Sequence, residues 1–599
     1  MRYRAGDAAR LDGALAPAPR RRALMGAMVL AIAALAATGA FAQTASQITP
    51  QSFRPPEERP AAGAALAPVE AAPAPEGADR LFVTLSGVDV EDAFAGMDEA
   101  GRAVAARLVG RRVSGAEIFA ASSALEAAYA KAGFVLVRVV LPPQTLVDGG
   151  RLKLVVVDGF IERVDAQGVP ERARARVEAV LAPLAGRRGL TLAEIERRVL
   201  LAGDAPGVLL RSTLAPGTGQ GATVLVVEAN YEPMGGLVSV DNSLSASLGR
   251  WSLGTGLDLN GVFGLGELVY LRATGDPNAG QYGFLNETPR NRALAAGLVL
   301  PLGADGASFN LEATQARANA IPTEGVSRAS SFTRASARLR YPFVRARALN
   351  LNGEISFDAV EERQNLVVAA GSIPLARDRL RVMRLTGDGN WEAPWGGVLA
   401  ARATASFGLD GLGARGTQPA DAPVPLTRQF ADASFSKIDA FASYAQPVVE
   451  HLSVAGFVRA QTSFGQALPQ SEQIGLATPT GLSSFDAGTV QGDSGVALRA
   501  EIASPWNLPA ADGVVVTLSP YLFGAVGATA FARPTELESA VRRAAAYGLG
   551  LRVAGVQKGG FAAGSLSLEW GRRGGGSGGF FEARPQGGDR FMLAVSLKL

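Results

Sequence analysis

A period-two alternation of apolar with small or polar residues runs from about Tyr231 to the C-terminal Leu599. It constrains the fold more than any other feature of the sequence. In the stretch 252–259, leucine and threonine alternate with serine, glycine and aspartate, and the stretches 309–314 and 591–599 alternate in the same way. Successive side chains of a β-strand point to opposite faces, so each strand has one apolar face and one small or polar face. Many such strands of about ten residues are typical of a barrel that crosses an outer membrane.

The length of the alternating region indicates the size of the barrel. Residues 231–599 would form about 16 strands at roughly 23 residues per strand and connection, and single-chain barrels have an even number of strands. A soluble β-sandwich also alternates, so each strand by itself is weak evidence. We therefore predict an all-β transmembrane barrel of about 16 antiparallel strands, preceded by smaller α+β domains.

The N-terminus has the features of a secretory signal peptide over residues 1–42. A basic stretch, Arg20–Arg22, precedes fifteen uncharged residues, and Ala-Phe-Ala at 40–42 matches a small-x-small cleavage site. Gln43 is the expected mature start. The uncharged run is shorter than the ~20 residues that a spanning helix needs. Since no comparable run follows, the chain would have to span a bilayer as a closed barrel.

The composition of the chain argues against most kinds of catalytic site and metal site. The chain of 599 residues has no cysteine, one histidine (His451) and a formal net charge of +3. Disulfide scaffolds, thiolate metal sites and histidine-centred relays lack material, and the charge is too small to indicate nucleic-acid binding. The glycine-rich stretch 261–266 has no βαβ context, so we interpret it as a turn. We expect no catalytic, cofactor-binding or metal-binding residues, and therefore no enzyme and no cofactor.

Two modules of mixed helix and strand are expected before the barrel, at 80–159 and 160–230. They follow a Pro- and Ala-rich stretch, 43–79, that is typical of a linker. Each module contains a capping box, in which Ser or Thr precedes Glu by three residues at a helix N-terminus. The boxes are Ser114-Gly115-Ala116-Glu117 and Thr191-Leu192-Ala193-Glu194. The expected strands are 81–90, 134–141 and 152–157 in the first module and 208–214 and 222–228 in the second.

Both modules resemble the POTRA domains of two-partner secretion transporters, the haemolysin secretion and activation proteins of the ShlB/FhaC/HecB type. Residues 129–159 read YAKAGFVLVRVVLPPQTLVDGGRLKLVVVDG, which is similar to the first POTRA domain of that family. Residues 200–228 read LLAGDAPGVLLRSTLAPGTGQGATVLVVE, which is similar to the second. The resemblance implies a bacterial outer-membrane transporter with periplasmic POTRA domains and a 16-stranded barrel, which secretes one partner exoprotein without ATP.

The resemblance also implies how the unfolded exoprotein is captured. The edge of a POTRA sheet offers unpaired backbone N–H and C=O groups to an extended chain by strand addition. Family members often carry a plug helix in the pore ahead of these domains, and the prolines of 43–79 argue against a long helix here. The passenger-binding candidates are Phe134, Val135, Leu136 and Val137 of the first module and Val208, Leu209 and Leu210 of the second.

Long loops are expected near 415–429, 471–493 and 572–579. They would be extracellular, because barrels of this type have short periplasmic turns. In the family, one long hairpin loop folds back into the pore and carries Val-Arg-Gly-Phe or Val-Arg-Gly-Tyr after a Ser-Glu-Gln segment, which the stretch 468–476 matches. The pore-loop motif itself reads Leu482, Ser483, Ser484 and Phe485, and the matching motif on a later barrel strand consists of Phe523, Ala525 and Gly527.

The family's ion pair between that loop and that strand is absent on both sides. Ser483 stands where the arginine would be, and Ala525 stands where the aspartate would be. Removing one member of a buried pair costs ~3–5 kcal/mol, whereas removing both can be close to neutral. The resemblance implies that Ser483 and Ala525 face each other in the pore. Phe485 would then anchor the loop by packing, and Ser483 or Ser484 would anchor it by hydrogen bonds.

Other functions stay open for a chain of this organisation. An outer-membrane protein assembly or insertion factor also joins POTRA domains to a 16-stranded barrel, whereas a diffusion porin needs no such modules and a surface adhesin needs longer external loops. The expected partners are the secreted exoprotein, outer-membrane lipid and, during biogenesis, the barrel assembly machinery. The chain ends on Leu599 rather than on an aromatic residue. A neighbouring gene for a large secreted β-helical protein would favour secretion.

Overall fold

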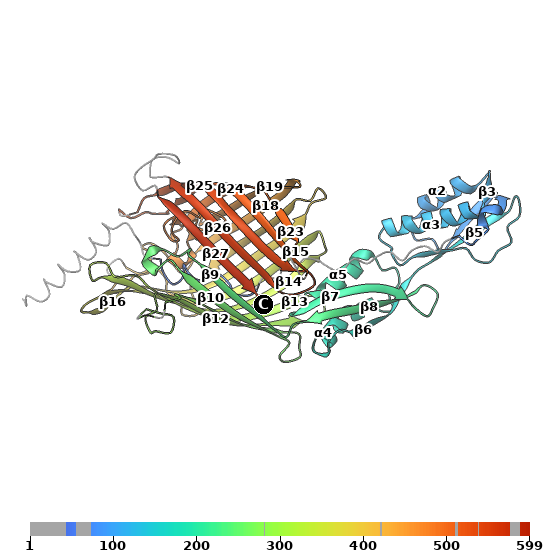
Figure 1. Ribbon diagram of the computed structural model, residues 1–599. Helices are drawn as coiled ribbons and strands as arrows, with labels where there is room; N and C mark the ends of the chain where they lie inside the picture. The colour runs from blue at the N-terminus through green and yellow to red at the C-terminus, as the bar shows by residue number, and fades with distance from the viewer. Residues whose placement is uncertain are drawn as a thin grey trace, which may run out of the picture.

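The computed structural model describes residues 43–55, 74–278, 280, 282–419, 422–509, 513–536, 538–574 and 588–599. The expected signal peptide, 1–42, lies outside these residues. Two small modules lie in line at one end of a large barrel, with α2 and α3 far from the barrel and α4 and α5 next to it (Figure 1). Among the described residues, no helix combines the length and the apolarity that crossing a membrane requires.

The first module packs two helices on a small sheet. The predicted capping box at Ser114 is confirmed, because its side chain accepts from the Glu117 amide while Glu117 reaches back to the Ser114 amide. The sheet order is β2-β5-β4, with β2 parallel and β4 antiparallel to β5, and β1 pairs separately with β3. The elements are η1 (Ala78–Arg80), β1 (Phe82–Thr84), β2 (Gly87–Glu91), α2 (Asp98–Leu108), β3 (Arg112–Ser114), α3 (Gly115–Lys131), β4 (Arg138–Val140) and β5 (Arg151–Val157).

The second module repeats this design. Its capping box at Thr191 is also confirmed and starts the helix whose Ile195 and Val199 are buried. The sheet order is β6-β8-β7, with β6 parallel and β7 antiparallel to β8. The elements are β6 (Phe160–Gly168), α4 (Glu171–Leu181), η2 (Ala182–Leu184), α5 (Leu192–Gly203), β7 (Val208–Pro216) and β8 (Ala222–Tyr231).

Residues 134–137 join the two modules and do not belong to a strand. The prediction of a strand over 134–141 is correct only for β4, and the four residues before β4 contain a turn at 135–136. Leu136 inserts into the apolar core of the second module, whereas Val137 inserts into that of the first. The Leu192 amide also donates to the Gly133 carbonyl at 2.7 Å. Burial in both cores therefore overrides the strand preference of this apolar run.

Sixteen antiparallel strands form the closed barrel, because β22 and β23 pair one after the other along β24 and count as one strand. The barrel closes where Ala594–Lys598 of the last strand pair with Leu237–Asp241 of the first. The strands are β9 (Met234–Asp241), β10 (Ser252–Asn260), β11 (Leu268–Gly275), β12 (Asn291–Leu302), β13 (Ala307–Asn319), β14 (Ser327–Arg345), β15 (Leu349–Val368), β16 (Gly371–Glu392), β17 (Val398–Gly408), β18 (Ser436–Val449), β19 (Leu452–Thr462), β22 (Ser494–Ala503), β23 (Trp506–Pro509), β24 (Val514–Ala530), β25 (Val541–Gln557), β26 (Ala563–Gly574) and β27 (Asp589–Lys598).

The predicted alternation sorts the side chains of the barrel into two faces. On β13, Asn310, Glu312 and Thr314 are buried on the inside, while Leu311 between them is 45% exposed on the outside. The outer face is therefore apolar and the inner face polar, as a barrel in a lipid bilayer requires. Short elements lie between strands: η3 (Ala246–Leu248), η4 (Gln470–Glu472), β20 (Ile474–Gly475) and β21 (Gln491–Gly492).

Candidate functional site: the filled barrel lumen

Residues 43–55, here called the lumen segment, lie inside the barrel. The linker predicted over 43–79 is wrong for this part, while 56–73 lie outside the described residues. Glu312 of β13 accepts hydrogen bonds from the Phe53 amide at 2.8 Å and the Ser52 hydroxyl at 3.1 Å. The segment is a turn at 45–48 followed by irregular chain rather than a helix. Sequence patterns missed this position because the contacts join residues about 260 positions apart in the chain.

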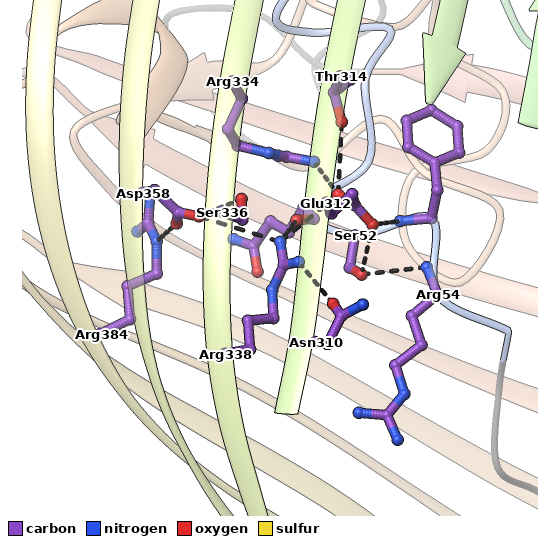
Figure 2. A network of polar contacts seen from close by, with 12 residues as sticks. Ser52, Arg54, Asn310, Glu312, Thr314, Arg334, Ser336, Arg338, Asp358 and Arg384 are labelled. Carbon is purple, nitrogen blue, oxygen red and sulfur yellow. Dashed lines mark hydrogen bonds and ion pairs between the residues drawn. The ribbon is translucent and has the colours of Figure 1, made fainter. Parts of the chain in front are cut away.

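Buried arginines of the barrel wall also hold this segment, and Figure 2 shows two of them, Arg334 and Arg338, beside Glu312. Arg334 and Arg338 of β14 donate to the carbonyls of Pro50 and Gln51, each at 2.9 Å. Both guanidinium groups also lie near the Glu312 carboxylate, at 3.1 and 3.5 Å. Charge-assisted bonds of this kind are among the stronger hydrogen bonds in proteins. The C-terminal part of the lumen segment, residues 50–53, is therefore held by the barrel wall through directional polar contacts.

The N-terminal part of the lumen segment packs against the loops at the extracellular end of the barrel. Ala45 is fully buried in an apolar cluster with Leu248, Ala293 and Leu468, and its amide donates to the Ser330 hydroxyl at 2.7 Å. The Gln43 side chain accepts from the Ser245 amide at 3.1 Å. The segment thus fills the lumen from the loop after β9 to the inner face of β13 and β14.

The loop between β19 and β22, residues 463–493 and here called the pore loop, also folds into the lumen. Its lead-in carries Glu472, which is 3% exposed and lies between two cations of the wall. Arg384 of β16 binds Glu472 through two bonds of 2.7 and 3.0 Å, and Lys437 of β18 lies at 3.0 Å. Arg384 in turn binds Asp358 of β15 at 2.8 Å. The lead-in is therefore anchored to one side of the barrel by a network of buried charges.

The tip of the pore loop packs on the opposite side. Leu482 is fully buried in an apolar cluster with Phe523 and Ala525 of β24, and half-buried Phe485 packs against that cluster. A Cβ atom on Gly527 would lie 3.1 Å from Leu482, so the glycine leaves room for the loop. The two sequence motifs therefore lie together in the lumen, as part of one apolar contact.

Hydrogen bonds of the tip go to neighbouring strands rather than to β24. Ser483 is 4% exposed, donates to Glu569 of β26 and accepts from Arg499 of β22 at 2.8 Å. Ser484 is also buried, but its hydroxyl has no partner among the described residues. Ser483 is thus the side chain that anchors the motif by hydrogen bonds, and Leu482 and Phe485 supply its packing.

The two occupants of the lumen touch each other. The Gln47 side chain of the lumen segment donates to Gln491 of the pore loop. Their ion-pair networks also approach, since Arg338 lies 3.9 Å from Asp358, which binds Arg384. A continuous line of charged side chains therefore runs from Glu312 at the segment to Glu472 at the loop.

The passenger-binding candidates predicted in the first module are not accessible as a strand edge. Leu136 and Val137 are each 3% exposed, and Phe134 and Val135 pack against the two module cores. The following strand β4 is also covered, because the Val139 amide donates to Glu126 and the Val139 carbonyl accepts from Ser122, both of α3. The residues 134–137 therefore pack in the cores of the two modules and are not exposed for binding.

The candidates of the second module lie on a sheet edge. Strand β7 pairs with β8 and forms one border of the sheet, with Val208 and Leu210 buried and Leu209 half-buried. Because Val208 pairs with Tyr231, this edge begins where the chain enters the barrel.

The second module is fastened to the periplasmic turns of the barrel. Arg345 and Asp204 form a bidentate pair with two bonds of 2.7 Å, and Arg198 binds Asp305 at 2.8 Å. The Tyr231 hydroxyl donates to the Asn260 carbonyl at 2.6 Å. These contacts come from different elements of the module and hold it over the barrel mouth.

Comparison with known proteins agrees with this architecture. Residues 220–553, more than half of the chain, match the haemolysin secretion/activation protein family ShlB/FhaC/HecB, and residues 83–159 match the ShlB-type POTRA domain. The chain belongs to this family of two-partner secretion transporters. Its barrel is accordingly an outer-membrane barrel, and its POTRA domains lie in the periplasm.

Individual relatives are distant. The chain is 24% identical over 383 residues to the outer membrane transporter CdiB of Dickeya dadantii, an alignment that covers 64% of this chain and 65% of that relative, just under two thirds. The solved structure of CdiB from Escherichia coli aligns with a TM-score of 0.63 at 18% identity, over 98% of this chain and all of that one. CdiB from Acinetobacter baumannii gives 0.55 at 14% identity, over 97% and 98%. These two structures share the fold.

The sequence motifs did not point to the charged wall residues Arg384, Lys437, Arg499 and Glu569. The alternation contains a usable signal, because Arg384, Arg499 and Glu569 each have an inward position between two apolar neighbours, and Lys437 is followed by Ile438. Leu498 and Leu568, for example, are 48% and 41% exposed beside Arg499 and Glu569. A charge with inward parity on a barrel strand is thus a candidate partner for a lumen occupant.

Proposed function

We propose that this chain exports one partner exoprotein across the outer membrane by two-partner secretion. One observation carries this proposal: a closed barrel is filled by two segments of its own chain, and a POTRA module is fastened over its periplasmic mouth. A diffusion porin needs an open lumen, so the filled lumen argues against that alternative. The segments are held largely by side-chain hydrogen bonds and ion pairs, which a polar, wet lumen can exchange for water when a passenger enters.

We propose that the exoprotein docks on the edge of β7. An extended chain can add to a sheet edge through backbone hydrogen bonds. The β7 edge begins beside Tyr231, where β8 continues into the barrel, so a strand added there would lead toward the mouth. The edge of β4 is not proposed, because α3 side chains already bind the backbone of Val139.

We further propose that export needs neither catalysis nor a cofactor. Within the described ranges, no group of three His, Cys, Asp or Glu residues is placed to hold a metal ion. Folding of the passenger outside the cell would prevent its return. Besides the exoprotein, the proposed partners are outer-membrane lipid around the apolar outer face and the barrel assembly machinery during biogenesis.

The test is co-expression of this chain with a candidate large exoprotein from a neighbouring gene. We expect the exoprotein in the culture medium only when the chain is present. An exoprotein that stays in the periplasm beside correctly inserted chain would contradict the proposal. A general loss of other outer-membrane proteins on deletion of the chain would instead favour an assembly factor.

A further inference from the structure

Arg499 is a fully buried guanidinium at the centre of the contact between the pore loop and the wall. Its side chain is 0% exposed, and each of its three nitrogens has a partner. Nη2 donates to Glu569 at 2.6 Å, Nη1 donates to the Ser483 hydroxyl at 2.8 Å, and Nε donates to Glu501 at 2.7 Å. The group also lies 3.9 Å from the centroid of the Phe523 ring. Such complete satisfaction is what a buried cation requires.

The charges around Arg499 balance within the wall itself. Glu501 is bound by Arg552 of β25 through two bonds of 2.6 and 2.8 Å, so two cations face two anions, Glu501 and Glu569. Tyr521 of β24 donates its hydroxyl to Glu569 at 2.8 Å. The pore loop contributes no charge to this group. It contributes the hydroxyl of Ser483, which is bonded to both Glu569 and Arg499, and the carbonyl of Gly481, which accepts from Arg499 Nη1 at 3.4 Å.

The position of Arg499 explains how a loop with Ser483 is held against a strand with Ala525. In the pairing of β22 with β24, Arg499 lies directly opposite Ala525. A methyl group at that position leaves space beside the guanidinium, and the anion comes from β26 instead. Both charges therefore belong to strands of the closed barrel.

We propose that Arg499 and Glu569 are positioning residues that form a latch for the pore loop, with Ser483 as its releasable part. A buried charge carried by the loop itself would leave an unpaired partner in the wall each time the loop moved. Here departure of the tip from Arg499 breaks the hydrogen bonds of one hydroxyl and one backbone carbonyl, and leaves the Arg499–Glu569 pair intact. The latch holds the closed state, and the Ser483 contact opens without separating Arg499 from Glu569. The opening step rests on the proposed function, whereas the latch in the closed state does not.

A second contact restrains the neighbouring part of the tip. Arg590 of β27 donates to the Phe485 carbonyl and lies 3.0 Å from Asp486. Loss of the Ser483 hydroxyl is therefore expected to loosen the tip rather than to release the whole loop.

The test uses the absence of cysteine from the chain. Ser484→Cys places a thiol beside the latch, where the native hydroxyl is 1% exposed and has no hydrogen-bond partner among the described residues. The rate of maleimide labelling of purified, reconstituted protein, without any exoprotein, then reports how often the tip leaves the wall. Single-channel conductance in planar bilayers is the second readout.

In the Ser484→Cys background, Ser483→Ala and Glu569→Gln should each raise the labelling rate by about ten-fold or more and increase the frequency of open-channel events. Ser483→Thr keeps the hydroxyl and should stay close to the parent rate. The matched control is Asp258→Asn, which breaks another ion pair of the barrel wall, with Arg272 at 2.7 Å, on β10 and β11 away from the latch. It should leave labelling unchanged.

Parent-like labelling in both Ser483→Ala and Glu569→Gln would overturn the latch. An equal rise in the Asp258→Asn control would also overturn it, because the effect would then be general loosening of the barrel. If Glu569→Gln fails to insert, Ser483→Ala still decides, since it leaves the wall pair in place. Failure of secretion as the function would show only in the assay with exoprotein, so the two outcomes are separable.

Discussion

The POTRA modules bury mainly apolar side chains, whereas the barrel also buries many polar and charged ones. In the first module the interior consists of residues such as Ile118, Leu125 and Leu154, each 0–2% exposed. In the barrel the most buried side chains include Asn310, Glu312 and Arg499. Apolar burial is non-directional and stabilises one permanent packing, whereas a polar interior depends on specific partners. The part of this molecule that is proposed to open is thus the part whose contacts water can replace.

Complete removal of the modules should have the largest effect. Deleting residues 80–229 should abolish secretion while the barrel still inserts, because the strand pattern after Tyr231 closes on itself. The exoprotein in the medium and heat-modifiable barrel in outer-membrane fractions are the two measurements. Undiminished secretion by the truncated chain would show that the modules do not capture the passenger.

Within the barrel, Glu472→Ala should have the next largest effect. It leaves Arg384 and Lys437 buried with one anion fewer, and an uncompensated buried charge costs ~3–5 kcal/mol. We expect the pore loop to leave the lumen more often and the conductance in planar bilayers to rise. A conductance equal to that of the parent protein would mean that Glu472 does not hold the loop.

The matched change in a module is Leu154→Ala, at a core position that is fully buried. Large-to-small substitutions of this kind cost about 2–5 kcal/mol. Hydrogen exchange of α3 and β5 amides in the full chain should show the loss, with channel conductance unchanged. A change in conductance in this variant would show that packing in the module core affects the closure of the barrel lumen.

A smaller effect is expected for the pair Ser483 and Ala525. Ser483→Arg brings a second guanidinium against Arg499, so it should reduce secretion. Ala525→Asp adds an anion directly opposite Arg499 and should restore part of it. A double-mutant cycle on secretion yield should give a coupling of about 0.5–3 kcal/mol. Strictly additive effects would mean that the two positions do not interact.

The smallest expected effect lies in the second module. Thr191→Ala removes the cap of α5 and should cost about 1 kcal/mol of module stability. The Thr191 amide and then the Arg187 guanidinium hold the pKa of Glu194 below its usual range. The contribution of Glu194 is therefore present above the unfolded-state pKa and is lost as the pH falls through the lower folded-state pKa. The variant loses the bond from the Thr191 hydroxyl to the Glu194 carboxylate, 2.9 Å in the parent. The difference in thermal stability between variant and parent should therefore be smaller at acidic than at neutral pH.

Local signals predicted the modules well. Capping boxes act within four residues, so Ser114 and Thr191 marked their helices correctly. The prediction of a strand over 134–141 was wrong for its first four residues, because Leu136 is buried in the core of the second module. A run of apolar residues does not say which core will bury it.

The sequence by itself determined the barrel, its approximate strand number and the inward or outward face of each residue, because a period of two is a local property of the strand. Only the tertiary structure decided what fills the lumen. The bonds of Phe53 with Glu312, Arg384 with Glu472 and Arg499 with Glu569 join residues from 70 to 259 positions apart. Closure of the barrel brings these side chains together, and an alternating pattern carries no information about which inward charge will meet which.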